Sequence, residues 1–428
     1  MAIRNEIIIR DVSCSSNEIR TTFCLNGNLD KYFKTNEFIV SYSTEISNIP
    51  YGVAVIPFVC NVLPIVWLTN AVLYCDELDY DFYNCIEFIK AGYKSMYPTL
   101  QFSGEIKCKT VRYQPTKRDE KSLVFFSGGV DAFASLVAHV DENPTLFSIC
   151  GADINVENQV GWEVVMGEIR NVSSVFNLPA IYCYSNFRQF INEENLCLLV
   201  DNLGAKIDYW YGFQHGIALL GHVAPLTYKR GYNNIYIGAS YTLRERAICT
   251  CASDPRIDNN VRFLDALVYH DQFDKNRQEK IRSIISFSKK NDIAIKLRVC
   301  WQSDTGGNCC LCEKCIRTIY AILAEKEDPK GFGFYNVNLG LMKRRLQKDI
   351  VLSKTSMPFW DDIIERINEY PKGTTHVEWL RNYTALKLNS NVVKVSHSLI
   401  LDLNRKIMKI ALRCVRLLKK INICTLRG

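Results

Sequence analysis

The spacing of hydrophobic residues changes along the chain and divides it into three predicted parts. In the first part, short apolar runs bounded by turn residues predict strands at residues 6–12, 20–25 and 38–42. Apolar residues at helical spacing from Phe82 to Tyr93 predict one helix. Residues 1–118 are therefore expected to form a β-rich domain.

From residue 122 onward, predicted strands alternate with predicted helices. The strands are expected at residues 123–126, 144–150, 179–184, 234–238 and 293–299, and the helices at residues 131–140, 161–176, 207–226 and 276–289. This alternation predicts a doubly wound parallel sheet over residues 119–330, in an α/β domain. Ligands of such sheets bind beyond the carboxyl ends of the strands, where the strand order reverses. Residues 331–428 are expected to form a helical extension.

One hydrophobic run has two interpretations. Residues 46–75 contain no charged side chain, and 30 such residues are enough to span a bilayer. The run also contains Pro50, Pro57 and Pro64, and its β-branched residues come in short bursts. We therefore expect buried strands separated by turns.

Composition excludes several classes of protein. Apolar residues make up 48% of the chain and charged residues 23%, which is typical of a globular protein and not of a disordered or fibrous one. The 18 cysteines are mostly scattered singly along a long chain, unlike those of a disulfide scaffold. The first residues lack the pattern of a signal peptide. Together these features predict a cytoplasmic protein with free thiols.

The positive charge is concentrated at the carboxyl end. The chain has 52 basic and 45 acidic residues, and residues 401–428 hold eight of the basic and one of the acidic ones. The remaining 44 basic and 44 acidic residues balance, which makes nucleic acid an unlikely partner for the body. The tail is expected to form a basic amphipathic helix that docks on its own domain; contact with a membrane surface or an acidic protein is the alternative. Deleting residues 401–428 is expected to leave the chemistry of the body intact.

The most informative segment is residues 123–132, in which an apolar strand runs into two glycines and a helix starts at once. Its ligand-facing residues are expected to be Ser127, Gly128, Gly129, Val130, Asp131 and Ala132. Glycines let the backbone approach a ligand, and a helix start offers unpaired N–H donors to phosphate oxygens. The spacing fits neither the Walker loop nor the dinucleotide fingerprint. A plain strand-to-helix turn with Asp131 as the N-cap is the alternative.

Four cysteines share the spacing C-x8-C-x2-C-x2-C: Cys300, Cys309, Cys312 and Cys315. Four thiolates this close together suit a tetrahedral Zn²⁺ ion with a structural role. Three alternatives remain open. Cys310 could replace Cys309 as a ligand, the site could hold an iron–sulfur cluster, or the cysteines could be incidental.

Both motifs resemble those of one enzyme family. The segment Ser127-Gly128-Gly129-Val130-Asp131 resembles the Ser-Gly-Gly-x-Asp signature of the PP-loop ATP pyrophosphatases, and the cysteine spacing is similar to the zinc site of the 7-cyano-7-deazaguanine synthases within that group. The resemblance covers about residues 122–324. It implies a PP-loop fold, ATP held by its β- and γ-phosphates, Mg²⁺, and a structural Zn²⁺. The family often has serine at the position of Ala132, so this chain lacks one hydroxyl near the phosphates.

The resemblance also implies a reaction and further site residues. Family members transfer AMP to a substrate oxygen and release pyrophosphate; the synthases convert a carboxylate with ammonia and two ATP. Ser127 and Asp131 would serve catalysis. His215 lies where the synthases have a substrate-proximal Arg-Asn pair, and Arg256 lies in a loop loosely similar to their Pro-Asp-x-Arg substrate loop. A packed core histidine and a solvated turn are the respective alternatives.

The expected function is therefore that of a divergent ligase. It would adenylate a 7-deazaguanine or another small polar substrate for attack by ammonia or an amine. Two alternatives remain. One is a PP-loop enzyme that acts on a sugar or thiolates tRNA, for which the Cys249-Thr250-Cys251 segment could carry sulfur. The other is a nucleotide-binding module of a multi-protein system, which the alanine at residue 132 favours.

Overall fold

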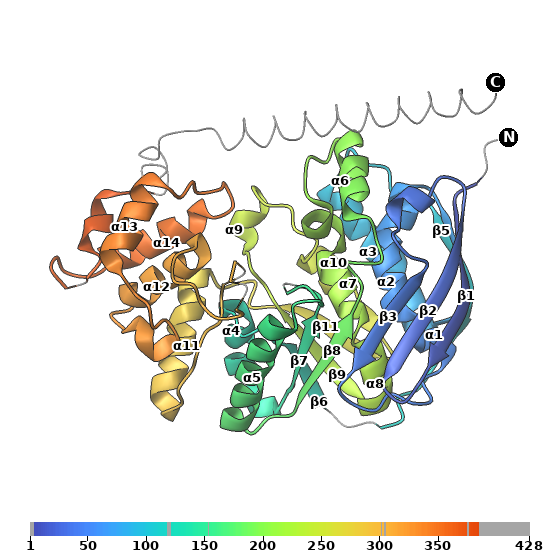
Figure 1. The fold of residues 1–428 in the computed structure, drawn as a ribbon, viewed down its shortest axis with the longest axis horizontal. Coiled ribbons are helices and arrows are strands. Elements are labelled where there is room, and N and C mark those ends of the chain that lie inside the picture. Colours follow the sequence, from blue (N-terminus) through green and yellow to red (C-terminus); the bar gives the residue numbers. More distant parts are fainter. Residues whose placement is uncertain are drawn as a thin grey trace.

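One sheet of 11 strands runs through the part of the chain that the computed structural model describes, which is residues 4–117, 121–152, 154–300, 302–303, 305–374 and 376–384. The strand order is β10-β11-β9-β6-β7-β8-β3-β2-β1-β4-β5 (Figure 1). Six of the ten neighbouring pairs are parallel: β1/β4, β4/β5, β6/β7, β7/β8, β6/β9 and β9/β11. The expected α/β class with a mostly parallel sheet is thus confirmed.

The amino-terminal strands form where the short apolar runs predict them. β1 (Glu6–Cys14), β2 (Glu18–Asn26) and β3 (Glu37–Tyr42) pair in antiparallel fashion, and α3 (Tyr80–Met96) is the expected helix. β3 then pairs with β8 (Ala180–Ser185), so the sheet continues from the amino-terminal segment into the α/β segment. Two further strands, β4 (Val72–Asp79) and β5 (Glu105–Val111), complete this side of the sheet.

The prediction of strands within residues 46–75 is wrong for most of that run. The chain forms α1 (Tyr51–Ala54) and α2 (Ile56–Leu68) before it enters β4. Every residue of α2 is buried, so apolar side chains lie on all sides of the helix. The sequence of α2 therefore lacks the helical periodicity of hydrophobic residues from which a helix is predicted. Pro57 lies in its first turn, where the missing N–H has no helical partner to lose. Among the described helices, none is both long and apolar enough to cross a bilayer.

The second half of the sheet has the doubly wound order. Its strands and helices are β6 (Lys121–Phe125), α4 (Val130–His139), β7 (Thr145–Cys150), α5 (Gln159–Phe176), α6 (Glu193–Asn202), β9 (Tyr232–Gly238), α9 (Leu243–Arg246), α10 (Pro255–Asp258), β10 (Arg262–Phe263), β11 (Ala266–Asp271) and α11 (Arg277–Asn291). From β6 the chain moves outward through β7 to β8, and it then returns to the other side of β6 as β9. The strand order therefore reverses at β6, where such sheets bind ligands.

Two predicted elements differ from the structure. The helix expected over residues 207–226 is divided into a π-helix (Trp210–Gln214), α7 (His215–Gly221) and α8 (Ala224–Arg230). The break lies at Gly216, whose φ of 26° no helix residue adopts. The strand expected over residues 293–299 is absent from the described sheet. The amide of Arg298 instead donates to the carbonyl oxygen of Gly128 at 2.8 Å.

Two hydrophobic cores cover opposite faces of the sheet. On β7, Leu146 belongs to one core and its neighbour Phe147 to the other, because successive strand residues point to opposite faces. One core unites the amino-terminal strands with α2, α3 and α7. The other contains α4, α5 and α11 together with the carboxyl-terminal helices α12 (Glu313–Ala324), α13 (Leu339–Lys348) and α14 (Met357–Asn368).

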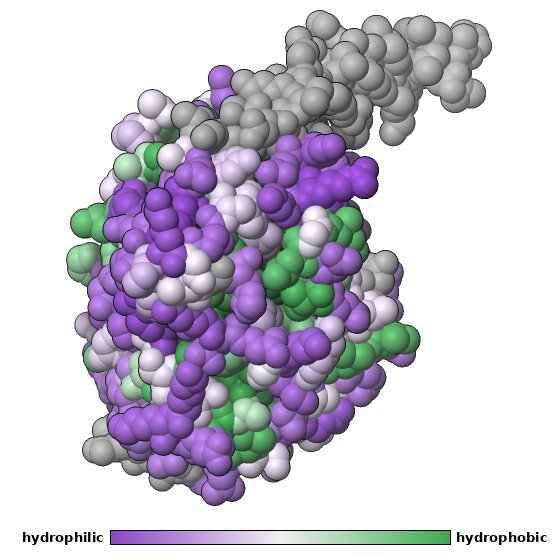
Figure 2. Space-filling view, turned by 90° about the vertical axis from the view of Figure 1, so that its left-hand side faces the viewer, coloured by the Kyte–Doolittle hydropathy of each residue, from purple (hydrophilic) through white to green (hydrophobic). Residues whose placement is uncertain are grey.

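The carboxyl-terminal helices form one end of the molecule in Figure 1. Figure 2 faces that end, and its surface is largely hydrophilic with separate hydrophobic patches. The expected helical extension is present as far as residue 384. The basic tail at residues 401–428 lies outside the described residues.

Candidate functional site

A cavity of about 370 Å³ opens at the carboxyl ends of β6, β7 and β9. It therefore lies where the strand order reverses. The predicted loop forms part of its wall through Ser127, Gly129, Val130, Asp131 and Ala132.

The loop has the backbone form of an anion cradle. Gly128 adopts a φ of +77°, which strongly favours glycine. Gly129 is the N-cap of α4, and no side chain caps that helix. Asp131 is thus not the cap, in contrast to the alternative of a plain turn. The first N–H groups of α4 are left for an external acceptor or for water.

Asp131 is held as a carboxylate by the basic residues around it. One of its oxygens, Oδ2, accepts hydrogen bonds from Arg277 Nη1 at 3.0 Å and from Ser240 Oγ at 3.2 Å, and Lys280 Nζ lies 3.7 Å from the other. Burial would raise the pKa of Asp131, but Arg277, Lys280 and Lys314 together outweigh burial and hold that pKa below its usual value. The second oxygen, Oδ1, is buried and accepts no hydrogen bond.

Positive charge dominates the cavity. Its basic wall residues are Arg277, Arg298, Lys314 and Arg317, whereas Asp131 is the one acid among the described wall residues. The Arg317 side chain is only 8% exposed, and burial lowers its pKa. Its guanidinium lies 4.3 Å from the ring of Phe359 on α14. Glu168 and Glu313, which are not among the wall residues, lie 3.8 Å from Arg298 and 3.6 Å from Arg317. The wall itself still has more basic than acidic residues, which favours an anionic ligand.

Aromatic and thiol side chains line another part of the wall. Trp210, Tyr211 and His215 come from the π-helix and the start of α7, and Tyr241 and Cys251 come from the chain after β9. The predicted residue His215 therefore does reach the cavity. Its neighbour Gln214 is fully buried and donates to Asn61 Oδ1 at 2.9 Å, which makes it part of the core.

Arg256 does not line the cavity. Its Nε and Nη2 donate to the two carboxylate oxygens of Asp254 at 2.8 and 3.0 Å. Asp254 also caps α10 by accepting from the Arg256 amide. The structure thus separates Arg256 from Ser127, Asp131 and His215, and it shows a structural ion pair at this position.

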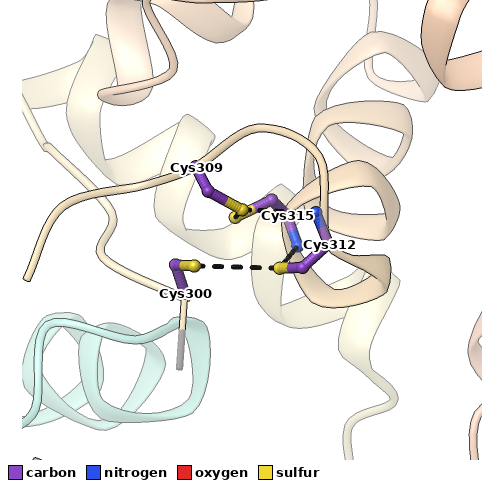
Figure 3. Close-up of side chains that lie close together, drawn as sticks. All are labelled: Cys300, Cys309, Cys312 and Cys315. Carbon is purple, nitrogen blue, oxygen red and sulfur yellow. Dashed lines mark hydrogen bonds between the residues drawn. The ribbon is translucent and has the colours of Figure 1, made fainter. Parts of the chain in front are cut away.

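The four predicted cysteines lie together, with every sulfur within 4.8 Å of the others. Sulfur–sulfur distances are 3.8 Å between Cys300 and Cys312 and 3.9 Å between Cys309 and Cys315 (Figure 3). Zinc–sulfur bonds of about 2.3 Å in a tetrahedron place the sulfurs about 3.8 Å apart, so the cluster fits a zinc ion. An iron–sulfur cluster sets several atoms between the thiolates and would hold them farther apart.

Backbone donors support thiolates at this cluster. The amides of Leu311 and Cys312 donate to Cys309 Sγ at 3.4 and 3.3 Å, and the amide of Cys315 donates to Cys312 Sγ at 3.4 Å. The neighbouring thiols, that of Cys315 first, hold the pKa of Cys312 below its usual value. Cys310 is not part of the group, and its thiol faces the carbonyl oxygen of Asn308 at 3.9 Å.

The cluster also positions cavity residues that sequence analysis did not select. Cys300 follows Arg298 by two residues, and Cys312 is the N-cap of α12, whose first turns carry Lys314 and Arg317. Lys314 and Arg317 are three residues apart on a helix that begins inside the cysteine motif, and residues at this spacing share one face of a helix. This spacing is the signal by which sequence analysis could have selected both residues. Nothing in the sequence distinguishes Arg298 from other basic residues.

Comparisons with known proteins yield no relative: no protein-family model, curated protein or solved structure matches the chain. The PP-loop resemblance therefore stays a prediction.

Proposed function

We propose that the chain binds ATP in the cavity and transfers AMP to an oxygen of a small polar substrate, with release of pyrophosphate. One observation carries the proposal. The uncapped start of α4 and its glycine loop face a cavity with four basic wall residues, at the point where strand order reverses. A triphosphate is a small biological anion whose negative charge suits this excess of basic residues in the cavity wall.

The chain's own residues supply positioning and charge. In the reaction, a substrate oxygen attacks the α-phosphorus, the bond to the β-phosphate oxygen breaks, and pyrophosphate leaves with the electron pair. Arg277, Arg298, Lys314 and Arg317 would stabilise the charge on the phosphates. Asp131 is the one carboxylate among the described wall residues and would be the ligand for Mg²⁺.

The rest of the cavity is consistent with a flat, polar acceptor such as a nucleobase-like carboxylate. Trp210, Tyr211, Tyr241 and Phe359 contribute aromatic side chains to the wall, and Ser240 and Ser253 contribute hydroxyl groups. Ammonia or an amine would then displace AMP from the activated group. This substrate class follows the resemblance to the 7-deazaguanine enzymes.

A specific observation favours one alternative, a nucleotide-binding module without turnover. Ala132 lines the cavity with a methyl group, where the PP-loop family often has a serine hydroxyl. Such a module would bind ATP through the same loop and basic residues but would form no AMP.

The experiment measures ATP binding and AMP formation by the full chain with Mg²⁺, ammonium and a 7-deazaguanine carboxylate. We expect AMP and pyrophosphate in equal amounts, and a loss of at least 100-fold in Asp131→Asn. Asp141→Asn, at an exposed position just after α4, is the matched control and should keep full activity. ATP binding without AMP formation would favour the nucleotide-binding module. Equal activity of the wild type and Asp131→Asn would contradict the proposal.

A further inference from the structure

The backbone is irregular in residues 210–216 and 251–253, the two segments that contribute Trp210, Tyr211, His215, Cys251 and Ser253 to the cavity wall. The π-helix ends at Gln214, and Gly216, the second residue of α7, has a φ of 26°. A Cβ at Gly216 would lie 2.6 Å from the carbonyl oxygen of Ala252 and 3.0 Å from the Cα of Ser253. Only glycine therefore lets the 251–253 loop approach this closely. Single π-helical turns of this kind are frequent at functional sites.

The approach brings a thiol and an imidazole together inside the cavity. Cys251 Sγ lies 3.8 Å from His215 Nδ1, and both side chains line the cavity. The ring of Trp210 stands edge-on to the His215 ring, with 5.0 Å between centroids and 89° between planes. The amide of Ala252 donates to the carbonyl oxygen of Tyr211 at 2.8 Å, which ties the loop to the π-helix. Both members of the pair thus have fixed positions.

The nearby thiol of Cys249 has a different environment. Its sulfur lies 2.6 Å from the hydroxyl of Tyr211, which also donates to Tyr241 Oη at 2.8 Å. Cys249 is not among the described residues that line the cavity. The two cysteines are separated by one residue, but only Cys251 combines a basic partner with access to a cavity ligand.

We propose that Cys251 is a nucleophile that receives an acyl group from an acyl adenylate, with His215 as its general base. This rests on the proposed function, which supplies the mixed anhydride of a carboxylate and AMP. Cys251 Sγ attacks the carbonyl carbon, and its proton passes to His215 Nδ1. The carbon–oxygen bond to AMP breaks, and AMP leaves with the electron pair. A thioester to Cys251 remains.

The thioester is then consumed by an amine or ammonia. The amine nitrogen attacks the thioester carbon, the carbon–sulfur bond breaks, and Cys251 leaves as a thiolate. His215 returns the proton to sulfur, the amine loses its own proton to water, and an amide is formed. Burial raises the pKa of Cys251, so the thiol is protonated at rest, and proton transfer to the adjacent imidazole accompanies the attack.

Acetyl adenylate is the probe that tests acyl transfer, because it needs no knowledge of the natural substrate. The full chain is mixed with acetyl adenylate, quenched in acid and mapped by peptide mass. We expect an acetyl thioester on Cys251, kept in Cys249→Ala and lost in Cys251→Ala. Acetylation of Cys251 should fall at least tenfold in His215→Gln. Folding of each variant is checked by thermal unfolding, and Cys251→Ser provides a closer replacement if alanine destabilises the loop.

A second probe separates this proposal from the proposed function. Iodoacetamide alkylates thiols without any nucleotide. The alkylation rate of Cys251 relative to that of Cys249 therefore reports on the Cys251–His215 pair and does not depend on ATP binding. We expect Cys251 to react faster than Cys249 and to slow at least tenfold in His215→Gln. If ATP displaces acetyl adenylate but no acetyl reaches Cys251, the thioester is refuted while ATP binding stands. If the iodoacetamide rate of Cys251 does not depend on His215, the pairing itself is refuted.

Discussion

Arg298 donates two hydrogen bonds to the carbonyl oxygen of Ser127, from Nε at 3.2 Å and from Nη2 at 2.9 Å. Its backbone amide donates to the next carbonyl oxygen of the loop, that of Gly128. Cys300, two residues later, belongs to the cysteine cluster. The glycine loop and the cysteine loop therefore support one another, although 170 positions separate Gly128 and Arg298 in a chain of 428.

Replacing Arg298 should weaken phosphate binding. Arg298→Met removes a buried cation and both bonds to Ser127, and hydrogen bonds of charged groups contribute about 2–3 kcal/mol. We expect the affinity for pyrophosphate, measured by titration calorimetry, to fall roughly 30- to 100-fold. The affinity of Arg298→Lys should lie between those of the wild type and Arg298→Met, because lysine keeps the positive charge but lacks the several N–H donors of a guanidinium.

Arg170→Met is the matched control for this prediction. Arg170 lies on α5, and its side chain is 55% exposed in a surface ion pair with Glu163. Surface pairs contribute little, so the affinity should not change. Equal effects of the two arginine substitutions would contradict a specific role for Arg298.

If the four cysteines hold a zinc ion, its removal should weaken pyrophosphate binding before the chain unfolds. Cys300 lies two residues after Arg298, and Cys312 caps α12, which carries Lys314 and Arg317. After treatment with a chelator, we expect a loss of zinc by elemental analysis and at least a tenfold lower affinity, with the circular dichroism spectrum retained. Cys309→Ser should reproduce this loss and Cys24→Ser, a half-buried cysteine of β2, should not. Full affinity in the metal-free protein would contradict the link.

The sequence was most informative where local chemistry determines the backbone. A hydrophobic strand, two glycines and a helix start predicted β6, the loop and α4, and the structure has all three. The cysteine spacing likewise predicted a cluster that the chain does bring together. In both cases the residues that determine the local structure lie within 16 consecutive positions.

The sequence was least informative where contacts between residues far apart in the chain determine the structure. The α2 run is buried on all sides, and an apolar run without a period does not separate helix from strand. Arg298 contacts Ser127, which lies 171 positions earlier, and this relationship leaves no pattern in one sequence.

Arg256 is a different case, because its partner Asp254 lies only two residues before it. Asp254 followed by Pro255 is a pattern typical of a helix start, and it could have indicated a helix cap in place of a substrate loop.

Phe359 should help to hold Arg317 in the cavity. Its ring packs against the Arg317 guanidinium and lies 5.7 Å from the Tyr241 ring, so the carboxyl-terminal extension supplies part of the wall. Phe359→Leu keeps most of the volume but removes a desolvated cation–π contact of about 2 kcal/mol. We expect a 3- to 30-fold weaker affinity for pyrophosphate. Phe88→Leu, at a ring that is 64% exposed on α3, is the control. A change confined to thermal stability would show that Phe359 acts only in packing.

His222 should make stability depend on pH. Its ring is fully buried, with Nε2 2.8 Å from Ser185 Oγ and Nδ1 2.7 Å from the carbonyl oxygen of Ala218. Burial lowers its pKa to about 4 in the folded chain, against an ordinary value of about 6.5. Between these values the unfolded chain binds a proton that the folded chain does not, so the contribution to stability is full above pH 6.5 and is lost as the pH falls toward 4.

The loss of unfolding free energy amounts to about 3 kcal/mol. Comparing the wild type with His222→Gln isolates this contribution. Asp79, whose pKa burial raises to about 6, has the opposite dependence, but it is present in both proteins and cancels in the difference. Urea unfolding at several values between pH 7.5 and 4 should therefore show the wild-type advantage shrinking as the pH falls. A difference in unfolding free energy that stays constant over this range would mean that the pKa of His222 is the same in the folded and the unfolded chain.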